Sequence, residues 1–444
     1  MNKIKGVGVD LKNMKKHLIH GILFGVLAVN VFYGAVLYSS AQEESKDERD
    51  SAYKSMEVFT QVMERVRSDY VDEDKVSYDD LIQGALEGML NSLDPHSDFM
   101  TEDAFKALKT DTQGSFGGVG IQVSIRDNTL TAIAPTEDGP AYREGVMPGD
   151  KIIKIGDQMT QKMTLDEAVK ELRGEPGTEV TITISRPSNG LVKEITIKRE
   201  IIKVDTVKDI NGKRDFNVDT NKIGYVRLTG FGEQTANDLS AAIDKFKEQK
   251  MEGLIIDLRN NPGGLLDQAA KICEMFLPRG QLVVSTEGRV DPKVEYYSRG
   301  KDRIPGVPIA VLVNGSSASA SEIVSGCLQD CKRAVIVGDQ TFGKGSVQTL
   351  IPLPDGSALR LTTAKYYTPS HKVIHEKGIT PDILIPMTPE EEEVLYIRRL
   401  GGSEDIFKSM SEEKRTFAEG VKDIQLERAH DLLKGVLILK SKKD

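Results

Sequence analysis

Between residues 205 and 385, short apolar runs alternate with helical patterns, and this alternation constrains the fold more than any other feature of the chain. The runs at 253–258 and 309–313 have the length and apolar character of strands buried on both faces of a sheet. Amphipathic helical patterns follow them, at 265–277 and 319–331. Strands that alternate with helices in this way predict an α/β core.

The remaining sequence divides around this core, because 444 residues exceed one common domain. Apolar residues recur every three or four positions between 51 and 93, which predicts helices. Another helix start follows residue 387, where Thr388 precedes Pro389 and a run of glutamates. The predicted parts are a leading segment (1–41), a helical N-terminal region (42–105), a β-rich domain (106–200), the α/β core (201–387) and a helical C-terminal region (388–444).

The leading segment has the features of an export signal. Five lysines precede an apolar run at residues 18–38, and lysines in that place keep their end in the cytoplasm. Small residues at 39–41 suit a signal peptidase, whereas the length of the run favours a retained membrane anchor. Both interpretations place the rest of the chain outside the cytoplasm. We therefore expect an exported protein, periplasmic or extracytoplasmic, and in the second case anchored in the cytoplasmic membrane.

Charge and cysteine content exclude several classes of protein. The net charge of −9 and the absence of a basic stripe argue against nucleic-acid binding. Three cysteines, Cys273, Cys327 and Cys331, cannot form a complete disulfide framework. They are too few for a closed zinc site unless a histidine joins them, so we interpret them as small buried residues.

The segment from 112 to 200 consists of short predicted strands and glycine turns, with a helix expected at 165–172. Glycines near its start allow consecutive backbone N–H groups to face one point and form a nest for a carboxylate. The strand that follows offers an edge to which the last residues of a peptide can add. The alternative is a tight turn without a ligand. The candidate carboxylate-binding residues are Gly117, Gly118, Val119, Gly120 and Ile121.

Two strand-to-helix turns of the core could carry chemistry. Asp257–Gly264 ends in two glycines that allow backbone N–H groups to face a ligand, although alone it fits a plain turn. Asn314–Glu322 puts Ser319 at a helix N-terminus, where the next N–H can point at an oxyanion. The competing interpretation is structural, because Ser319 and Glu322 have the spacing of a capping box.

A third stretch places Lys344 between two glycines in an apolar neighbourhood. Burial would lower the pKa of this lysine toward neutrality, and a neutral amine can remove the proton of a serine. If residues 344–350 are extended, Lys344 and Gln348 point to the same face, where the amide oxygen could orient the amine. The alternative is an exposed loop lysine.

Together these stretches resemble the C-terminal processing, or tail-specific, peptidase family between about residue 55 and residue 385. The resemblance implies that Ser319 is the nucleophile, that Lys344 is the general base and that Gln348 positions it. Two further stretches, Leu93–Ser97 and Leu359–Pro369, also look like the family.

The same resemblance implies the fold and the oxyanion donors. The family fold is a crotonase-like, or Clp-protease-like, α/β core preceded by a PDZ domain, here the β-rich domain. The implied donors are the backbone N–H of Ala320 and one from Gly263 or Gly264. The chain departs from the family at His371 and His375, which have a four-residue spacing but no evident third metal ligand.

We therefore expect a serine endopeptidase that cuts protein substrates recognised by free, apolar C-terminal tails, without a metal or other cofactor. A Ser-His-Asp triad is disfavoured, because no G-x-S-x-G pattern surrounds Ser319. The alternatives are an idle tail-binding scaffold or chaperone and a crotonase-like thioester enzyme. The coexistence of Ser319, Lys344 and Gln348 argues against an idle site. The sequence leaves open a homodimer through the helical ends and an activating adaptor.

Overall fold

The computed structural model describes residues 51–398 and 412–442, apart from short gaps at 127–128, 137–138, 148, 188–189, 204 and 291. The chain divides into two compact units, residues 1–89 and 90–444. The predicted export segment at 1–41 lies outside the described residues. Among the helices that are described, none is long and apolar enough to cross a membrane.

The described part of the first unit is helical, as the apolar periodicity predicts. A helix at 51–69 is followed by the short helix η1 (Glu73–Lys75) and by α2 (Tyr78–Asn91), which continues into the second unit. The Arg67 guanidinium lies 3.6 Å from the centre of the Tyr78 ring, and the Tyr78 hydroxyl donates a hydrogen bond to Glu64. The apolar stripe of the first helix, which includes Phe59 and Val62, is exposed.

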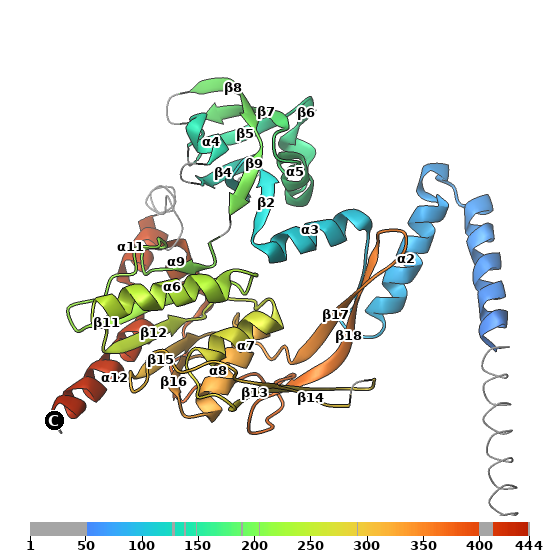
Figure 1. Cartoon of the computed structure of the whole chain (residues 1–444). Helices are drawn as coiled ribbons and strands as arrows, with labels where there is room; N and C mark the ends of the chain where they lie inside the picture. The colour runs from blue at the N-terminus through green and yellow to red at the C-terminus, as the bar shows by residue number, and fades with distance from the viewer. Residues whose placement is uncertain are drawn as a thin grey trace, which may run out of the picture. The chain divides into compact units, whose positions relative to one another are not determined.

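The α/β core of the second unit is a six-stranded sheet in the order β10-β11-β12-β15-β16-β19 (Figure 1). All neighbouring pairs are parallel except β10 with β11. Both predicted core strands are buried at every residue, as a sheet covered on both faces requires. The strands are β10 (Val207–Lys208), β11 (Ile223–Leu228), β12 (Gly253–Asp257), β15 (Ile309–Val313), β16 (Ala334–Gly338) and β19 (Ile383–Leu384).

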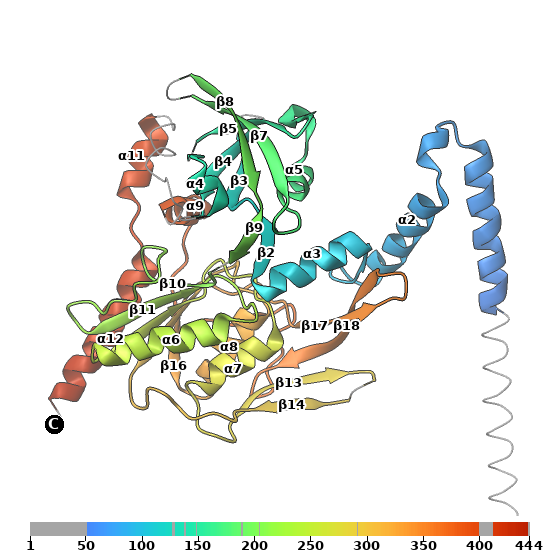
Figure 2. The ribbon, with the colours of Figure 1, turned by 45° about the horizontal axis from the view of Figure 1, so that its top comes forward.

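Helices cover the two faces of this sheet separately. Val226 and Ile256 pack with α6 (Thr235–Glu248), α7 (Leu266–Glu274) and α8 (Ala320–Asp330). Ile255 and Leu312 point the other way and pack against α12 (Ile424–Ser441). Figure 2 shows α6 and α12 on opposite sides of the strands. The alternation of side chains along each strand produces this division.

An antiparallel sheet extends from the core, in the order β1-β18-β13-β14, with β17 also paired to β18. Its first strand comes from the N-terminal side of the chain, and Asp98 is opposite Arg360 in the pairing of β1 with β18. This pairing joins segments about 260 residues apart in sequence. The strands are β1 (Asp98–Met100), β13 (Leu282–Gly288), β14 (Val294–Tyr297), β17 (Ser346–Pro352) and β18 (Ala358–Tyr367).

The β-rich domain has its own apolar core, formed by residues such as Ile152, Ile182 and Ile197. Its helix α5 (Leu165–Leu172) has the predicted bounds and begins with a capping box between Thr164 and Glu167. Its sheet runs in the order β3-β4-β5-β7-β8, with β6 paired to β5, and β2 pairs separately with β9. The strands are β2 (Ser115–Gly118), β3 (Ile121–Arg126), β4 (Thr129–Pro135), β5 (Lys151–Ile155), β6 (Gln158–Met159), β7 (Glu179–Arg186), β8 (Leu191–Lys198) and β9 (Glu200–Lys203).

The remaining helices connect these parts or end the chain, and the prediction of helices at both ends is confirmed. The helix start after residue 387 is also correct, because Thr388 and Glu391 form reciprocal side-chain to backbone hydrogen bonds. The helices are α3 (Glu102–Gln113), α4 (Pro140–Arg143), η2 (Thr160–Lys162), α9 (Pro389–Arg398) and α11 (Glu412–Gly420).

Candidate active site

Ser319 is the N-cap residue of α8, immediately after the turn that leaves β15. Its backbone has φ 54° and ψ −112°, a conformation that costs a non-glycine residue about 1–3 kcal/mol. Hydrogen bonds from Ala318 N–H and from the Ser321 hydroxyl to the Asn261 carbonyl, at 3.0 and 2.9 Å, fix the turn on both sides of Ser319. The structure therefore holds a half-buried serine in a strained position at a helix N-terminus.

The glycine turn lies directly against the serine turn. A Cβ added to Gly263, whose φ is 102°, would come within 2.7 Å of the Ala318 carbonyl oxygen and 2.9 Å of the Ala320 nitrogen. The Gly263 N–H donates to the Asn261 side chain at 2.9 Å. In contrast, the N–H groups of Gly264 and Ala320 have no hydrogen-bond acceptor among the described residues. These two groups are free to receive a ligand.

Glu322 joins the serine turn to the lysine loop. Its buried carboxylate accepts hydrogen bonds from the backbone N–H groups of Ser319, Gly343 and Lys344 and from the Thr341 hydroxyl, at 2.6–2.9 Å. Burial raises the pKa of Glu322, and these donors oppose the rise. The capping-box pattern is therefore real, and it also connects the candidate nucleophile to the candidate base. The sequence predicted only the helix cap, and not the hydrogen bonds that Glu322 accepts from the lysine loop.

Lys344 is half-buried in the described structure. Burial lowers the pKa of its amine, the positive charge of Arg360 lowers it further, and Asp94 acts in the opposite direction. A close approach fixes the backbone beside it, because a Cβ on Gly345 would meet the His375 nitrogen at 2.1 Å. The predicted lowering of the lysine pKa therefore agrees with the structure.

The side chains of Ser319 and Lys344 are not hydrogen-bonded to each other in the described structure. Instead, the Ser319 side chain interacts with Tyr366 of β18. Burial raises the pKa of this tyrosine to about 12, and the interaction with Ser319 opposes the rise. Tyr366 is thus protonated at neutral pH and can form a hydrogen bond with the serine hydroxyl.

The Gln348 amide is hydrogen-bonded to residues other than Lys344. β17 begins at Ser346, so Lys344 precedes the strand, and the register of β17 against β18 shifts between Val347 and Gln348. The extra residue at this shift is Thr363 of β18, so the alternation along β17 itself is not interrupted. The Gln348 amide donates to Ser346 and Thr362, at 3.1 and 2.9 Å. No hydrogen bond between Gln348 and Lys344 is present in the described part of the chain.

The β-rich domain has a groove of about 200 Å³ between β3 and α5. Apolar side chains dominate its lining, and α5 contributes Val169 and Leu172. Gly117 of β2 lies outside this lining, and its carbonyl accepts a hydrogen bond from the Gly174 N–H. The lining residues are Phe116, Gly118, Val119, Gly120, Ile121, Gln122, Val123, Val169, Leu172 and Arg173.

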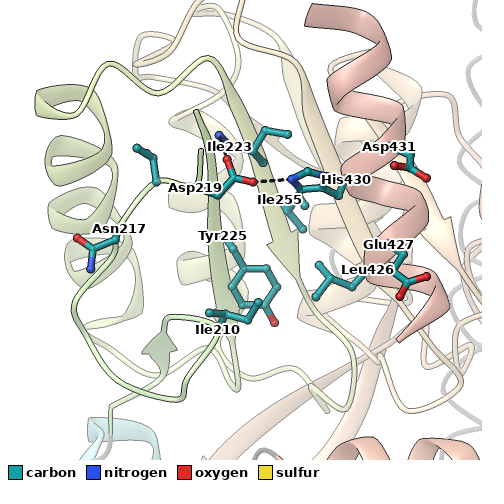
Figure 3. Close-up of a pocket in the computed structure, with 11 residues that line it drawn as sticks. Ile210, Asn217, Asp219, Ile223, Tyr225, Ile255, Leu426, Glu427, His430 and Asp431 are labelled. Carbon is teal, nitrogen blue, oxygen red and sulfur yellow. Dashed lines mark hydrogen bonds and ion pairs between the residues drawn. The ribbon is translucent and has the colours of Figure 1, made fainter. Parts of the chain in front are cut away.

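A second cavity, of about 450 Å³, lies between β11 and α12 and includes neither Ser319 nor Lys344 (Figure 3). Tyr225, Ile255 and Leu426 contribute apolar surface, and Asp219 is hydrogen-bonded to His430 at the side of the cavity. Strained backbone and perturbed pKa values mark the Ser319 turn instead, so we assign the candidate chemistry there.

Each of the two histidines that depart from the family pattern lies near a carboxylate. His371 lies 3.0 Å from a Glu287 carboxylate oxygen and stacks against Tyr367, while His375 lies 3.8 Å from Glu376. Among the residues that the structure describes, no three His, Cys, Asp or Glu side chains are arranged to hold a metal ion. The three cysteines are free thiols, with Cys273 and Cys327 buried.

Comparisons with known proteins agree with this organisation. The sequence profile of peptidase family S41 matches residues 222–385, and a PDZ-domain profile matches residues 133–186. A third profile, the N-terminal domain of the activating protease CtpB, matches residues 24–104.

Relatives match over most of the chain. A carboxy-terminal-processing protease of Bartonella bacilliformis is 42% identical over 94% of this chain and 96% of its own length. The carboxy-terminal processing protease CtpA of Bacillus subtilis is 36% identical over 72% of this chain and 66% of its own. A probable CtpA-like serine protease of Staphylococcus aureus is 33% identical over 87% and 75%. The chain therefore belongs to peptidase family S41 and is a serine protease of the carboxy-terminal processing type that carries a PDZ domain.

Proposed function

We propose that the chain hydrolyses peptide bonds with a catalytic dyad of Ser319 and Lys344. The observation that carries this proposal is the Glu322 carboxylate, which accepts the backbone N–H groups of both residues at 2.9 Å. It ties a strained serine at a helix N-terminus to a half-buried lysine. The lowered pKa of Lys344 favours the neutral amine that a general base needs.

In this mechanism Ser319 Oγ attacks the scissile carbonyl carbon while Lys344 Nζ accepts the hydroxyl proton. The tetrahedral intermediate collapses, the C–N bond breaks, and Lys344 gives its proton to the leaving amine. Water then attacks the acyl ester and loses a proton to Lys344, and the ester oxygen recovers that proton to restore Ser319. Each proton returns, so the cycle needs no cofactor.

The oxyanion is bound by the N–H groups of Gly264 and Ala320. Both lack an acceptor among the described residues, whereas the N–H of Gly263 is occupied by Asn261. Two preorganised donors of this kind typically contribute several kcal/mol to transition-state stabilisation. Gly263 serves instead as the contact that brings the two turns together.

The described arrangement is a resting state in this proposal. Ser319 interacts with Tyr366, and Gln348 is held by Ser346 and Thr362. A bound substrate brings the amine of Lys344 to the serine hydroxyl, and Gln348 then orients that amine. Apo geometry that tightens only with substrate is common in proton-transfer sites.

The substrate is a protein with a free, apolar C-terminal tail. The groove between β3 and α5 has an apolar lining suited to the last side chain, and the N–H groups of Gly118 to Ile121 supply the carboxylate nest. The N-terminal similarity to an activating protease domain supports an activating partner, and the exposed apolar stripe of helix 51–69 supports a homodimer. Residues 18–38 would export or anchor the chain, which acts outside the cytoplasm.

The test uses the purified full-length chain and an unstructured reporter with an apolar, free C-terminus. Cleavage lost in Ser319→Ala and in Lys344→Ala supports the dyad, and weaker cleavage of the amidated reporter supports tail capture. Ser316→Ala, at an exposed serine of the same turn, is the matched control and keeps activity. Full activity of Ser319→Ala would overturn the mechanism. Tail binding without cleavage by the wild-type chain would favour the scaffold.

A further inference from the structure

The cavity between β11 and α12 has the dimensions of a small-molecule site. Its volume of about 450 Å³ lies within the range of ligand pockets in proteins. The connection from β10 to β11 contributes Ile210, β11 contributes Tyr225, and α12 contributes Leu426. Figure 3 shows that Tyr225 and Leu426 reach the cavity from different elements. Ser319 and Lys344 lie outside the lining, so the cavity is not part of the candidate active site.

Apolar side chains supply much of the surface that a ligand in this cavity would touch. Ile223 and Ile255 are almost fully buried, and Tyr225 and Leu426 are partly buried. Ile210 is 55% exposed, so the packing of the chain leaves more than half of this apolar side chain uncovered. Removal of such surface from water is favourable, which predicts a ligand with an apolar body.

Carboxylates outnumber basic groups on the same lining. Asp219 is already paired, because it accepts the Ile223 N–H at 2.8 Å and is hydrogen-bonded to His430. Glu427 and Asp431 are exposed and lie four residues apart on one face of α12. Within the described parts of the chain, neither forms an ion pair or a side-chain hydrogen bond. Three carboxylates thus face one histidine, and the lining stays negative at neutral pH even when His430 is protonated.

The Tyr225 hydroxyl also suits a cation better than an anion. It donates its proton to the Asp257 carboxylate at 2.7 Å, so it presents only oxygen lone pairs to a ligand. An ammonium group can donate to such an oxygen, whereas a carboxylate has no proton to give. The tyrosine ring adds an aromatic surface, which attracts a cation that lies over its face.

We propose that this cavity binds a small apolar amine. The apolar body lies against Tyr225 and Leu426, and the ammonium group is attracted by Glu427 and Asp431. Charge complementarity selects the amine, because the same carboxylates repel an anion of similar shape. The site is independent of the proposed dyad and of tail capture, since it shares no residue with either.

The first experiment compares two probes of the same shape and different charge. Phenylbutylamine carries an ammonium group at neutral pH, and phenylbutanol carries a hydroxyl in its place. A ligand-observed NMR titration of the full-length chain at physiological salt is expected to show saturable binding of the amine, with the alcohol bound about fivefold or more weakly. Absence of saturable amine binding, or equal affinity for the two probes, would overturn the proposal.

The second experiment reverses the charge of the lining. The double variant Glu427→Lys and Asp431→Lys is expected to weaken amine binding about tenfold or more, since each exposed carboxylate becomes a cation. Glu248→Lys with Glu419→Lys is the matched control, because it changes the net charge equally at exposed helical positions outside the lining. The control should bind the amine as wild type does. Equal weakening in both double variants would mean that only the net charge of the chain attracts the amine, and it would refute the site.

Hydrogen exchange then locates the bound amine without any cleavage assay. Local opening that releases the ligand is suppressed by the factor 1 + [L]/Kd, so amides of α12 should exchange about tenfold more slowly at an amine concentration of nine times Kd. Amides of α5, beside the groove of the β-rich domain, should be unaffected. Slower exchange in α5 with none in α12 would place the amine in that groove and overturn the proposal. Failure of Ser319→Ala to abolish cleavage would refute the dyad and leave this result unchanged.

Discussion

The Glu322 carboxylate accepts the backbone N–H of Ser319 and the backbone N–H of Lys344, each at 2.9 Å. One buried carboxylate thus holds both the serine turn and the lysine loop. Lys344 is 22 residues from Glu322 in the sequence. A buried carboxylate that accepts four hydrogen bonds has its polar atoms fully paired. A side chain that cannot accept these bonds would leave several N–H groups without partners. Glu322 is therefore a positioning residue in the proposed mechanism.

Glu322→Gln is expected to lower kcat/KM by about 100-fold or more, because displacement of a reacting group by about 1 Å can cost that much. The amide keeps the volume, but its NH₂ group faces backbone donors and cannot accept from them. The expected loss of stability is about 1–3 kcal/mol. Steady-state kinetics and urea unfolding measure the two effects. Unchanged kcat/KM in a folded Glu322→Gln variant would contradict the positioning role.

Gly263→Ala is expected to abolish detectable cleavage and to destabilise the chain by about 2–4 kcal/mol. The new Cβ would lie 2.7 Å from the Ala318 carbonyl oxygen, and φ 102° is strained for alanine. Gly280→Ala is the matched control, because its φ of 84° is also positive but its Cβ would meet nothing within 4 Å. That control should cost about 1–2 kcal/mol and leave kcat/KM unchanged. Equal effects from both variants would show that backbone strain, rather than the contact between the turns, is responsible.

Arg259 links the glycine turn to α12, and its loss is expected to be costly. Its buried guanidinium binds Asp257 at 2.7 Å and Asp423, the N-cap residue of α12, at 2.6 Å. Arg259→Met removes the guanidinium that binds the fully buried Asp257, and we expect a loss of about 3–5 kcal/mol in urea unfolding.

Asp423→Asn is a comparison variant that changes the other carboxylate bound to Arg259, and we expect it to be less destabilising. Asparagine is a good N-cap residue, and Arg259 keeps its bond to Asp257, so we expect a loss of about 1 kcal/mol. If Arg259→Met proves no worse than Asp423→Asn, the buried ion pair does not stabilise the turn as argued here.

Asp330, at the end of α8, makes stability depend on pH. Burial acts to raise its pKa, but hydrogen bonds from Lys372 and Ser370 outweigh it, so the pKa in the folded chain is lowered. A lowered folded pKa stabilises the chain above the unfolded value of about 3.8, and this contribution is lost as pH falls through the folded value.

Asp330→Asn is therefore expected to lower the free energy of unfolding at pH 7 by about 1–3 kcal/mol. The difference from wild type should shrink as pH falls below 3.8, because the wild-type carboxyl becomes protonated. Chemical denaturation at a series of pH values measures it. A difference that stays constant down to pH 2 would show that the charge of Asp330 is not the source of the stabilisation.

The sequence determined the architecture because each level of pattern agreed with the others. Two fully apolar runs predicted the buried parallel strands β12 and β15, and helical periodicity predicted α5 with its correct bounds. Residue types also identified Ser319 and Lys344 as candidates. A serine at a helix N-terminus can face a ligand, and a lysine between two glycines in an apolar neighbourhood can be buried.

Contacts between distant segments were decided only by the tertiary structure. The partners of the Gln348 amide, Ser346 and Thr362, depend on the fold of β17 and its pairing with β18, so strand periodicity alone did not reveal them. The Asp94 turn reaches Thr362, which accepts the Gln348 amide, because β1 pairs with β18 across about 260 residues, and no local pattern encodes that pairing. The Gly263 N–H is occupied by a side-chain acceptor that the glycine motif does not reveal. Local sequence therefore fixed the elements and the reactive residue types, whereas hydrogen bonds and charges between distant segments decided which groups are free to act.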